Sequence, residues 1–87
     1  MRPGTFVKDL KYNIYGIVIS REEYLRSKEK NLARPNLNLD GQIPVIWSYR
    51  LNERMPHVAD LASLRAVDAS EVKDKSSELY ALSLGII

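Results

Sequence analysis

Two short runs of apolar residues dominate the hydrophobic pattern of this chain. They cover Tyr15–Ser20 and Ile43–Tyr49, are rich in β-branched and aromatic side chains, and are bounded by turn-forming or polar residues. This is the pattern of buried β-strands. With shorter strand-like segments on either side, the five predicted strands are Thr5–Val7, Ile14–Ile19, Ile43–Tyr49, Met55–Val58 and Leu64–Val67. The pattern predicts a mainly β fold, a small and strongly bent β-barrel of about five strands over residues 3–67.

Turn-forming residues punctuate these strands. Gly16, inside the second strand, indicates a bend or a close backbone approach, as at a barrel corner. Asp40-Gly41 favours a type I′ turn and a hairpin between Leu37–Leu39 and the strand that begins at Ile43. Asp60 is a candidate cap for a single helical turn before the last strand. We expect most of the barrel interior to come from Val7, Ile17, Ile19, Val45, Leu64 and Val67.

Residues 20–42 form a long polar insertion in the predicted barrel. Ser20 and Glu23 match a capping box, and the good helix formers that follow predict a short surface helix over about Arg21–Glu29. The basic residues of this insertion are candidate surface contacts for phosphate groups: Arg21, Arg26, Lys28, Lys30 and Arg34. Three glutamates accompany them, so we favour a solvated helix surface with local ion pairs.

The C-terminal part of the chain changes character twice. Residues 68–78 are charged and small, which predicts a linker, and residues 79–87 are largely apolar. Apolar side chains alternate there at period 2, so the segment is either a strand of the domain's own sheet or an arm that docks on a neighbouring subunit. We favour an arm that becomes ordered only in the assembly. Its candidate partner-binding residues are Tyr80, Leu82, Leu84, Ile86 and Ile87.

Composition excludes several classes of chemistry. The 87 residues suffice for one domain, include no cysteine and carry 13 basic against 11 acidic side chains. A disulfide or a thiolate metal site is therefore excluded, and the single histidine, His57, lacks a recognisable nucleophile nearby. We expect no enzymatic activity, no cofactor and no membrane partner, because no apolar run approaches the roughly 18 residues of a span. So small a domain gains stability from oligomerisation or docking.

Four segments of the chain carry a resemblance to a known family. They are Gly4–Val7, Gly16–Ile19, Val45–Ser48, and His57 to Asp60-Leu61 leading to Leu64–Val67. In this order they resemble the small SH3-like barrels encoded by tailed bacteriophages, although the insertion over residues 20–42 is longer than is usual there. The resemblance implies a non-enzymatic structural subunit of a virion assembled in the host cytoplasm. Its partners would be other structural subunits or a second copy, bound through the C-terminal arm and the barrel edges.

Two other functions stay open at this point. A small KOW-like or SH3-like barrel that binds nucleic acid would use the basic insertion, but a net charge of +2 is small for a dedicated binder. A peptide-binding adaptor would use Trp47 in an exposed groove, with Tyr12, Tyr15 and Tyr49 beside it. We favour Trp47 as a core residue, because Val45 and Ile46 next to it supply a packed surface on both faces of the strand.

Overall fold

The computed structural model describes residues 1–30, 41–50 and 57–86, except for the side chains of residues 27–30, 50 and 86. Its strands are β1 (Phe6–Asp9), β2 (Tyr15–Val18), β3 (Gln42–Trp47), β4 (His57–Asp60) and β5 (Leu64–Val67). Its helices are α1 (Arg21–Lys30), α2 (Ala69–Lys75) and α3 (Ser77–Ile86), with 3₁₀ turns η1 (Ser48–Arg50) and η2 (Leu61–Ser63). The fold is therefore a small mixed α/β domain rather than a mainly β one.

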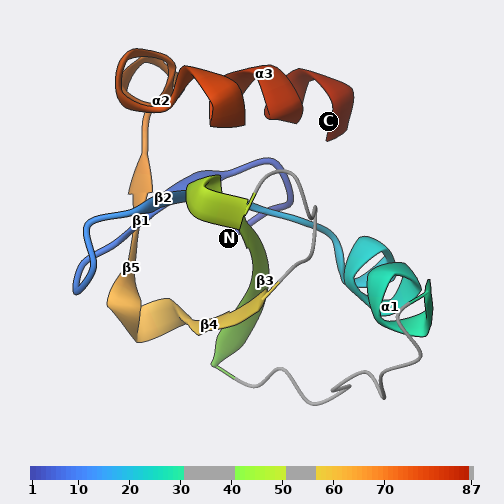
Figure 1. Cartoon of the computed structure of the whole chain (residues 1–87). Helices are drawn as coiled ribbons and strands as arrows, with labels where there is room; N and C mark the ends of the chain where they lie inside the picture. Colours follow the sequence, from blue (N-terminus) through green and yellow to red (C-terminus); the bar gives the residue numbers. More distant parts are fainter. Residues whose placement is uncertain (31–40, 51–56, 87) are drawn as a thin grey trace.

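The five strands form one antiparallel sheet in the order β4-β3-β2-β1-β5. The sheet is strongly curved, and η2 carries the chain from one edge strand, β4, to the other, β5 (Figure 1). No backbone ladder joins β4 to β5 within the described residues, so the sheet is not closed and the predicted barrel is corrected to an open sheet. Both edge strands span only four residues, and η2 turns the chain between them without pairing them.

Apolar side chains cover both faces of this sheet. The concave face holds one cluster, composed of Val7, Val18, Ile43, Val45, Trp47 and Leu64. The opposite face holds a second cluster, composed of Phe6, Ile17, Ile19, Tyr24, Ile46, Val72 and Leu79. Because successive strand residues point to opposite faces, Ile17 and Val18 belong to different clusters although they are neighbours in the chain.

The predicted core residues are buried, but they do not share one interior. Val7, Val45 and Leu64 line the concave face, whereas Ile17 and Ile19 lie on the face toward the helices. Val67 is only half-buried and packs at the margin of the second cluster. A shift of one residue reverses the face of a strand, so the sequence pattern shows that these residues are apolar without showing which side they face.

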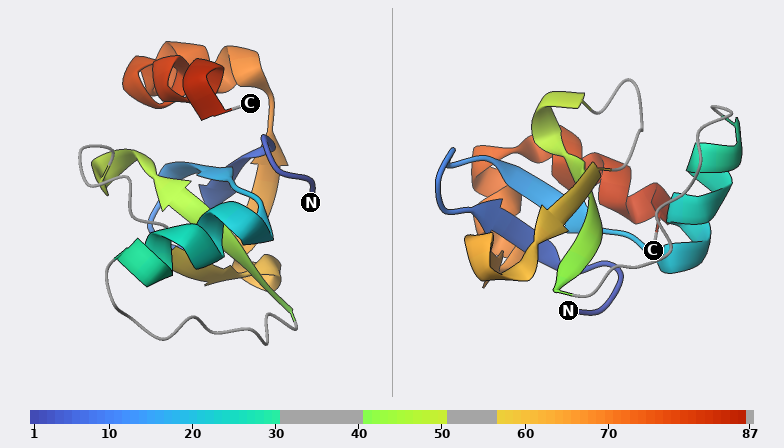
Figure 2. Two further views of the ribbon diagram at one scale, coloured as in Figure 1. Left: turned by 90° about the vertical axis from the view of Figure 1, so that its right-hand side faces the viewer. Right: turned by 90° about the horizontal axis from the view of Figure 1, so that it is seen from below.

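Helices α2 and α3 form a layer over the second apolar cluster (Figures 1 and 2). The segment predicted as a linker, residues 68–78, contains all of α2, and the predicted extended arm, residues 79–87, is helical up to Ile86. Val72 and Leu79 are completely buried against the sheet. The predictions of a linker and of an extended arm are thus wrong. Leu79, Leu82 and Ser83 also follow helical spacing, which the period-2 interpretation overlooked.

Three local predictions agree with the structure. The backbone N–H of Glu23 donates to Ser20 Oγ at 3.1 Å, as expected of a helix N-cap at the start of α1. Gly41 has φ of 70°, as the predicted turn requires, while its neighbour Asp40 and the partner strand Leu37–Leu39 lie outside the described residues. The helical turn after Asp60 is η2, although the Asp60 side chain makes no cap hydrogen bond and instead accepts one from Gln42.

Candidate functional site

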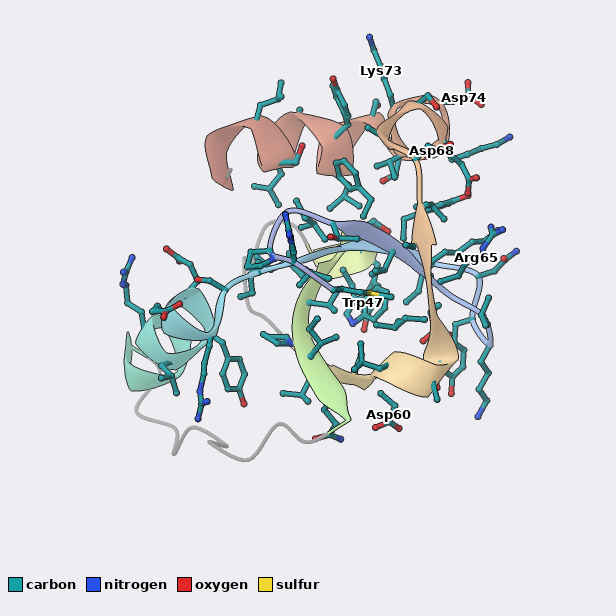
Figure 3. All side chains as sticks on the ribbon, turned by 180° about the vertical axis from the view of Figure 1, so that it is seen from behind. Trp47, Asp60, Arg65, Asp68, Lys73 and Asp74 are labelled. Carbon is teal, nitrogen blue, oxygen red and sulfur yellow. The ribbon has the colours of Figure 1, made fainter. Side chains whose placement is uncertain are left out.

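Trp47 belongs to the core. Only 5% of its surface is exposed, and its side chain lies inside the curve of the sheet (Figure 3). Tyr12 and Tyr49 are exposed and Tyr15 is half-buried, but a peptide groove built on Trp47 would need its ring at the surface. The aromatic residues that the adaptor interpretation grouped together therefore do not form a groove around Trp47.

The basic residues of the insertion are only partly described. Arg21 and Arg26 are exposed on α1, and Arg26 pairs with Glu23 one turn away, with 2.9 Å between Nη1 and Oε1. Lys28 and Lys30 continue the same helix, but their side chains, and all of Arg34, lie outside the described residues. The described part of α1 thus shows the local ion pairing expected of a solvated helix.

The C-terminal candidates separate into buried and exposed positions. Tyr80 and Leu82 pack against the domain's own sheet, and the Tyr80 ring stacks on Phe6 with 6.3 Å between ring centroids. Leu84 points away from the sheet and is 69% exposed. The side chain of Ile86 and the whole of Ile87 lie outside the described residues. Of the described candidates, only Leu84 presents a large apolar side chain fully to solvent.

Leu84 lies on a surface that we call the α3 outer face, formed by Ala81, Leu84 and Gly85. These three exposed residues are spaced three and four apart and therefore share one side of the helix. Glu78 is the sole charged residue in the sequence of α3. A Cβ placed on Gly85 would meet no atom within 4 Å, so the space beside Leu84 is open. The three residues of the α3 outer face thus carry no charge, and Leu84 is flanked on this face by the small residues Ala81 and Gly85. The face is directed away from the core.

A second exposed apolar surface was not predicted from the sequence. We call it the tip patch, and it consists of Leu10 and Tyr12 in the β1–β2 turn and Leu61 in η2, which are 59%, 66% and 38% exposed. The Leu10 N–H donates to the Ser63 carbonyl at 3.0 Å, which ties the turn to η2. Lys11 and Asn13 alternate with Leu10 and Tyr12 in this turn, so no apolar run marks the surface in the sequence.

Hydrogen bonds fix the conformation of the β1–β2 turn. Asp9 Oδ1 accepts from the backbone N–H groups of Lys11 at 2.8 Å and Tyr12 at 2.9 Å. Asn13 closes the turn with φ of 63°, a left-handed conformation that asparagine tolerates, and its N–H donates to the Asp9 carbonyl. An aspartate followed four residues later by an asparagine was the sequence signal for this turn. The exposed side chains of Leu10 and Tyr12 are consequently carried on an ordered backbone.

A polar cluster fastens α2 to the sheet. The Tyr15 hydroxyl donates to Glu71 Oε2 at 2.6 Å, and Arg65 Nη2 lies 3.9 Å from the same oxygen. Lys8, the partner of Tyr15 in the β1–β2 ladder, places its ammonium 5.4 Å from the centre of the Tyr15 ring. The hydrogen bond to Glu71, together with burial and the negative charge of Glu71, raises the pKa of Tyr15 above its ordinary value of 10.0. This arrangement holds the helix layer in place and keeps the phenol protonated.

The described residues contain no group of three or more histidine, aspartate or glutamate side chains placed to hold a metal ion. His57 lies at the start of β4, half-buried and opposite Val45 in the β3–β4 ladder.

In the part of the chain that the structure describes, none of the helices has the length and apolar character needed to span a bilayer.

Comparisons of this chain with protein-family models, with curated proteins and with solved structures give no significant match.

Proposed function

We propose that this chain is a non-enzymatic structural subunit of a phage particle and that it docks on its partners through the α3 outer face. The observation that carries the proposal is Leu84, which is 69% exposed on a helix whose inner side is already packed on the sheet. Single exposed leucines are common in soluble proteins. This one lies between Ala81 and Gly85, with the sole charge of α3, Glu78, near the other end of the helix.

Docking through a folded helix is physically simpler than docking through an arm. An arm of nine residues would lose about 1–2 kcal/mol of backbone conformational entropy per residue on binding. Residues of α3 are already ordered on their own sheet, so this cost is met during folding. The small residues around Leu84 also let another surface approach the helix closely. The partner-binding role proposed for the C-terminal segment is thus retained for Leu84. It is revised for Tyr80 and Leu82, which pack against the second apolar cluster and hold α3 on the sheet.

The phage setting is supported by the sequence pattern and by the strand order. The four segments that resemble small phage barrels correspond to β1, β2, β3 and the β4–η2–β5 unit. The first and last strands pair side by side, and a 3₁₀ turn separates β4 from β5, as in an SH3-like arrangement. We propose an SH3-like domain whose sheet is left open and whose outside is covered by α2 and α3.

Purified particles from the phage that encodes this chain test the proposal. We expect mass spectrometry to find the chain in particles at a fixed stoichiometry. A Leu84→Lys variant should be folded but absent from particles, since a lysine in the last turn of a helix is compatible with the helix dipole but not with an apolar contact. A Ser70→Lys variant adds the same charge on the exposed surface of α2 and should be incorporated normally. Absence of the wild-type chain from particles would overturn the proposal.

The nucleic-acid alternative is separated by a salt-titrated binding assay with DNA and RNA. Phosphate contacts impose a steep dependence of affinity on salt concentration. For a structural subunit with a net charge of +2 we expect only weak binding that disappears at physiological salt. Tight binding with a steep salt slope, reduced by Arg21→Ala, would favour the alternative.

A further inference from the structure

Strand β5 forms one edge of the sheet, with β1 beside it (Figure 1). Opposed residues of an antiparallel ladder alternate between pairs that exchange both backbone hydrogen bonds and pairs that exchange none. The Leu10 N–H donates to the Ser63 carbonyl and so marks a bonded pair. By this alternation Arg65 and Val67 are bonded to β1 as well. The alternate residues direct their backbone groups away from β1 and are Leu64, Ala66 and Asp68.

Two of these outward groups already have partners in the same chain. The Leu64 N–H donates to the Leu61 carbonyl of η2. Asp68 continues the extended conformation of β5, with ψ of 149°, and its carbonyl accepts from two N–H groups in the first turn of α2. The groups that bond to no other described residue are the Leu64 carbonyl, the N–H and carbonyl of Ala66, and the Asp68 N–H. The free groups of the β5 edge therefore lie between a satisfied N–H at one end and a satisfied carbonyl at the other.

We propose that β5 pairs with β5 of a second copy, antiparallel about a two-fold axis at Ala66. In this register Ala66 faces Ala66 of the second copy, and Leu64 faces Asp68. The two Ala66 residues exchange both hydrogen bonds, and each Asp68 N–H donates to the Leu64 carbonyl opposite. All free groups of both copies are used, and the satisfied Leu64 N–H lies opposite the satisfied Asp68 carbonyl. A two-fold contact uses the same surface on both subunits and closes at a dimer.

The satisfied groups at the two ends favour a second copy over an unrelated strand. A strand with every backbone group free would leave its carbonyl unpaired opposite the Leu64 N–H and its N–H unpaired opposite the Asp68 carbonyl. Backbone groups that lose water without gaining a partner oppose association. A shift to the next bonded register has the same fault, because it places the Ala66 carbonyl opposite the Leu64 N–H or the Ala66 N–H opposite the Asp68 carbonyl. The hydrogen-bonding pattern thus selects both the partner and the register.

The register does not bring like charges face to face. Arg65 lies opposite Val67 of the second copy, and Asp68 lies opposite an apolar residue, Leu64. Like charges directly opposed across two strands would destabilise the pairing. The two Arg65 side chains lie diagonally across the contact, and the Nη2 atom of each is 3.9 Å from Glu71 Oε2 of its own chain.

The surroundings of β5 leave room for another strand. Ala66, at the axis, is small and exposed. Helix α3 runs from α2 back across the sheet, away from β5, and Leu79 packs there in the cluster that contains Ile17 (Figure 1). The contact uses none of the residues of the α3 outer face, so it goes beyond the proposed phage role and does not depend on it.

Sedimentation equilibrium of two charged variants, alone and mixed, tests the register. Ala66→Lys and Ala66→Glu each place like charges opposite one another at the axis, and edge strands tolerate charged side chains well. At low salt we expect each variant alone to dimerise up to about fivefold more weakly than the wild type. The equimolar mixture should dimerise more tightly than either variant alone, because a lysine then faces a glutamate.

Ala66→Pro tests the hydrogen bonds themselves. Proline lacks an N–H and is accepted on an edge strand where that group would point to solvent. We expect a folded chain that stays monomeric at concentrations where the wild type is dimeric. Ala66→Ser is the matched control, since it keeps the N–H and should dimerise like the wild type. Arg65→Pro removes an N–H that bonds to β1, so its thermal unfolding should begin well below that of Ala66→Pro.

Three results would overturn the β5 contact. The first is a wild-type chain that stays monomeric up to its highest soluble concentration. The second is a folded Ala66→Pro variant that dimerises as tightly as the wild type. The third is a mixture of Ala66→Lys and Ala66→Glu that dimerises no better than its components, and this result alone decides if Ala66→Pro fails to fold.

Discussion

At the scale of single residues, Gly16 shows how closely the sheet is packed on its concave face. A Cβ at this position would lie 2.5 Å from Val45 Cγ1 and 2.7 Å from Trp47 Cε3. Both neighbours are almost completely buried and have little room to move. The close backbone approach predicted from the sequence is confirmed here, and its cause is the packing of Trp47 across the neighbouring strand.

We expect Gly16→Ala to lower the free energy of unfolding by about 1–3 kcal/mol, the range typical of an overpacked core. Denaturation by urea measures this change. Gly85→Ala is the matched control, because a Cβ there meets nothing within 4 Å and alanine favours a helix. Equal stability of Gly16→Ala and the wild type would contradict the packing described for Trp47.

A second residue-scale prediction concerns the hydrogen bond from Tyr15 to Glu71. The pKa of Tyr15 is raised in the folded state, so folding is favoured while the phenol keeps its proton. This contribution is fully present below the ordinary tyrosine pKa of 10.0 and is lost as the pH rises through the higher folded-state value. We expect Tyr15→Phe to unfold more easily than the wild type at neutral pH.

The difference between these two proteins should shrink as the pH is raised above 10, as followed by urea denaturation at a series of pH values. The comparison cancels the contribution of every group that the two proteins share. A difference that stays constant through this range would show that Tyr15 does not bond to Glu71.

At the scale of elements, α3 has an inner side and an outer side with opposite roles. Leu79 is completely buried against the sheet, whereas Leu84 is 69% exposed. We expect Leu79→Ala to lower the free energy of unfolding by about 2–5 kcal/mol, because it leaves a cavity in the core. Leu84→Ala, the same substitution five residues further along the helix, should change the free energy of unfolding by no more than about 0.5 kcal/mol. Comparable losses in both variants would mean that α3 is oriented differently.

The strands were predictable from the sequence, and the C-terminal helices were not. Tyr15–Ser20 and Ile43–Tyr49 combine β-branched side chains with flanking turn residues, and both contain strands of the structure. In Leu79–Leu84, apolar residues fit a period of 2 as well as a helical spacing, so local pattern does not decide between them. The contact of Leu79 with the second apolar cluster decides it, and that contact depends on the completed sheet.

At the scale of the whole molecule, the sequence predicted which residues are buried better than it predicted how the sheet and the helices are layered. Trp47 and most of the predicted core residues are buried, but the division of the sheet into two apolar faces depends on register, which pattern alone leaves open. Of the candidate docking residues, Leu84 remains exposed, while Tyr80 and Leu82 support α3. The tip patch was missed because Leu10 and Leu61 are far apart in the sequence, and only the folded chain joins their two segments, through the bond from the Leu10 N–H to the Ser63 carbonyl.

Amide hydrogen exchange of the isolated, monomeric subunit tests most directly whether α3 is already folded onto the sheet before the domain binds a partner. If α3 is a layer of the domain, the amides from Tyr80 to Ser83 should be protected to a degree comparable with those of β2 and β3, because the Tyr80 N–H donates to the Ser76 carbonyl and Leu79 unfolds only with the sheet it covers. Leu84→Lys should leave that protection unchanged. Exchange of these amides at the rate of an unfolded chain, while β2 and β3 stay protected, would show that the segment is an arm and would contradict docking through the α3 outer face.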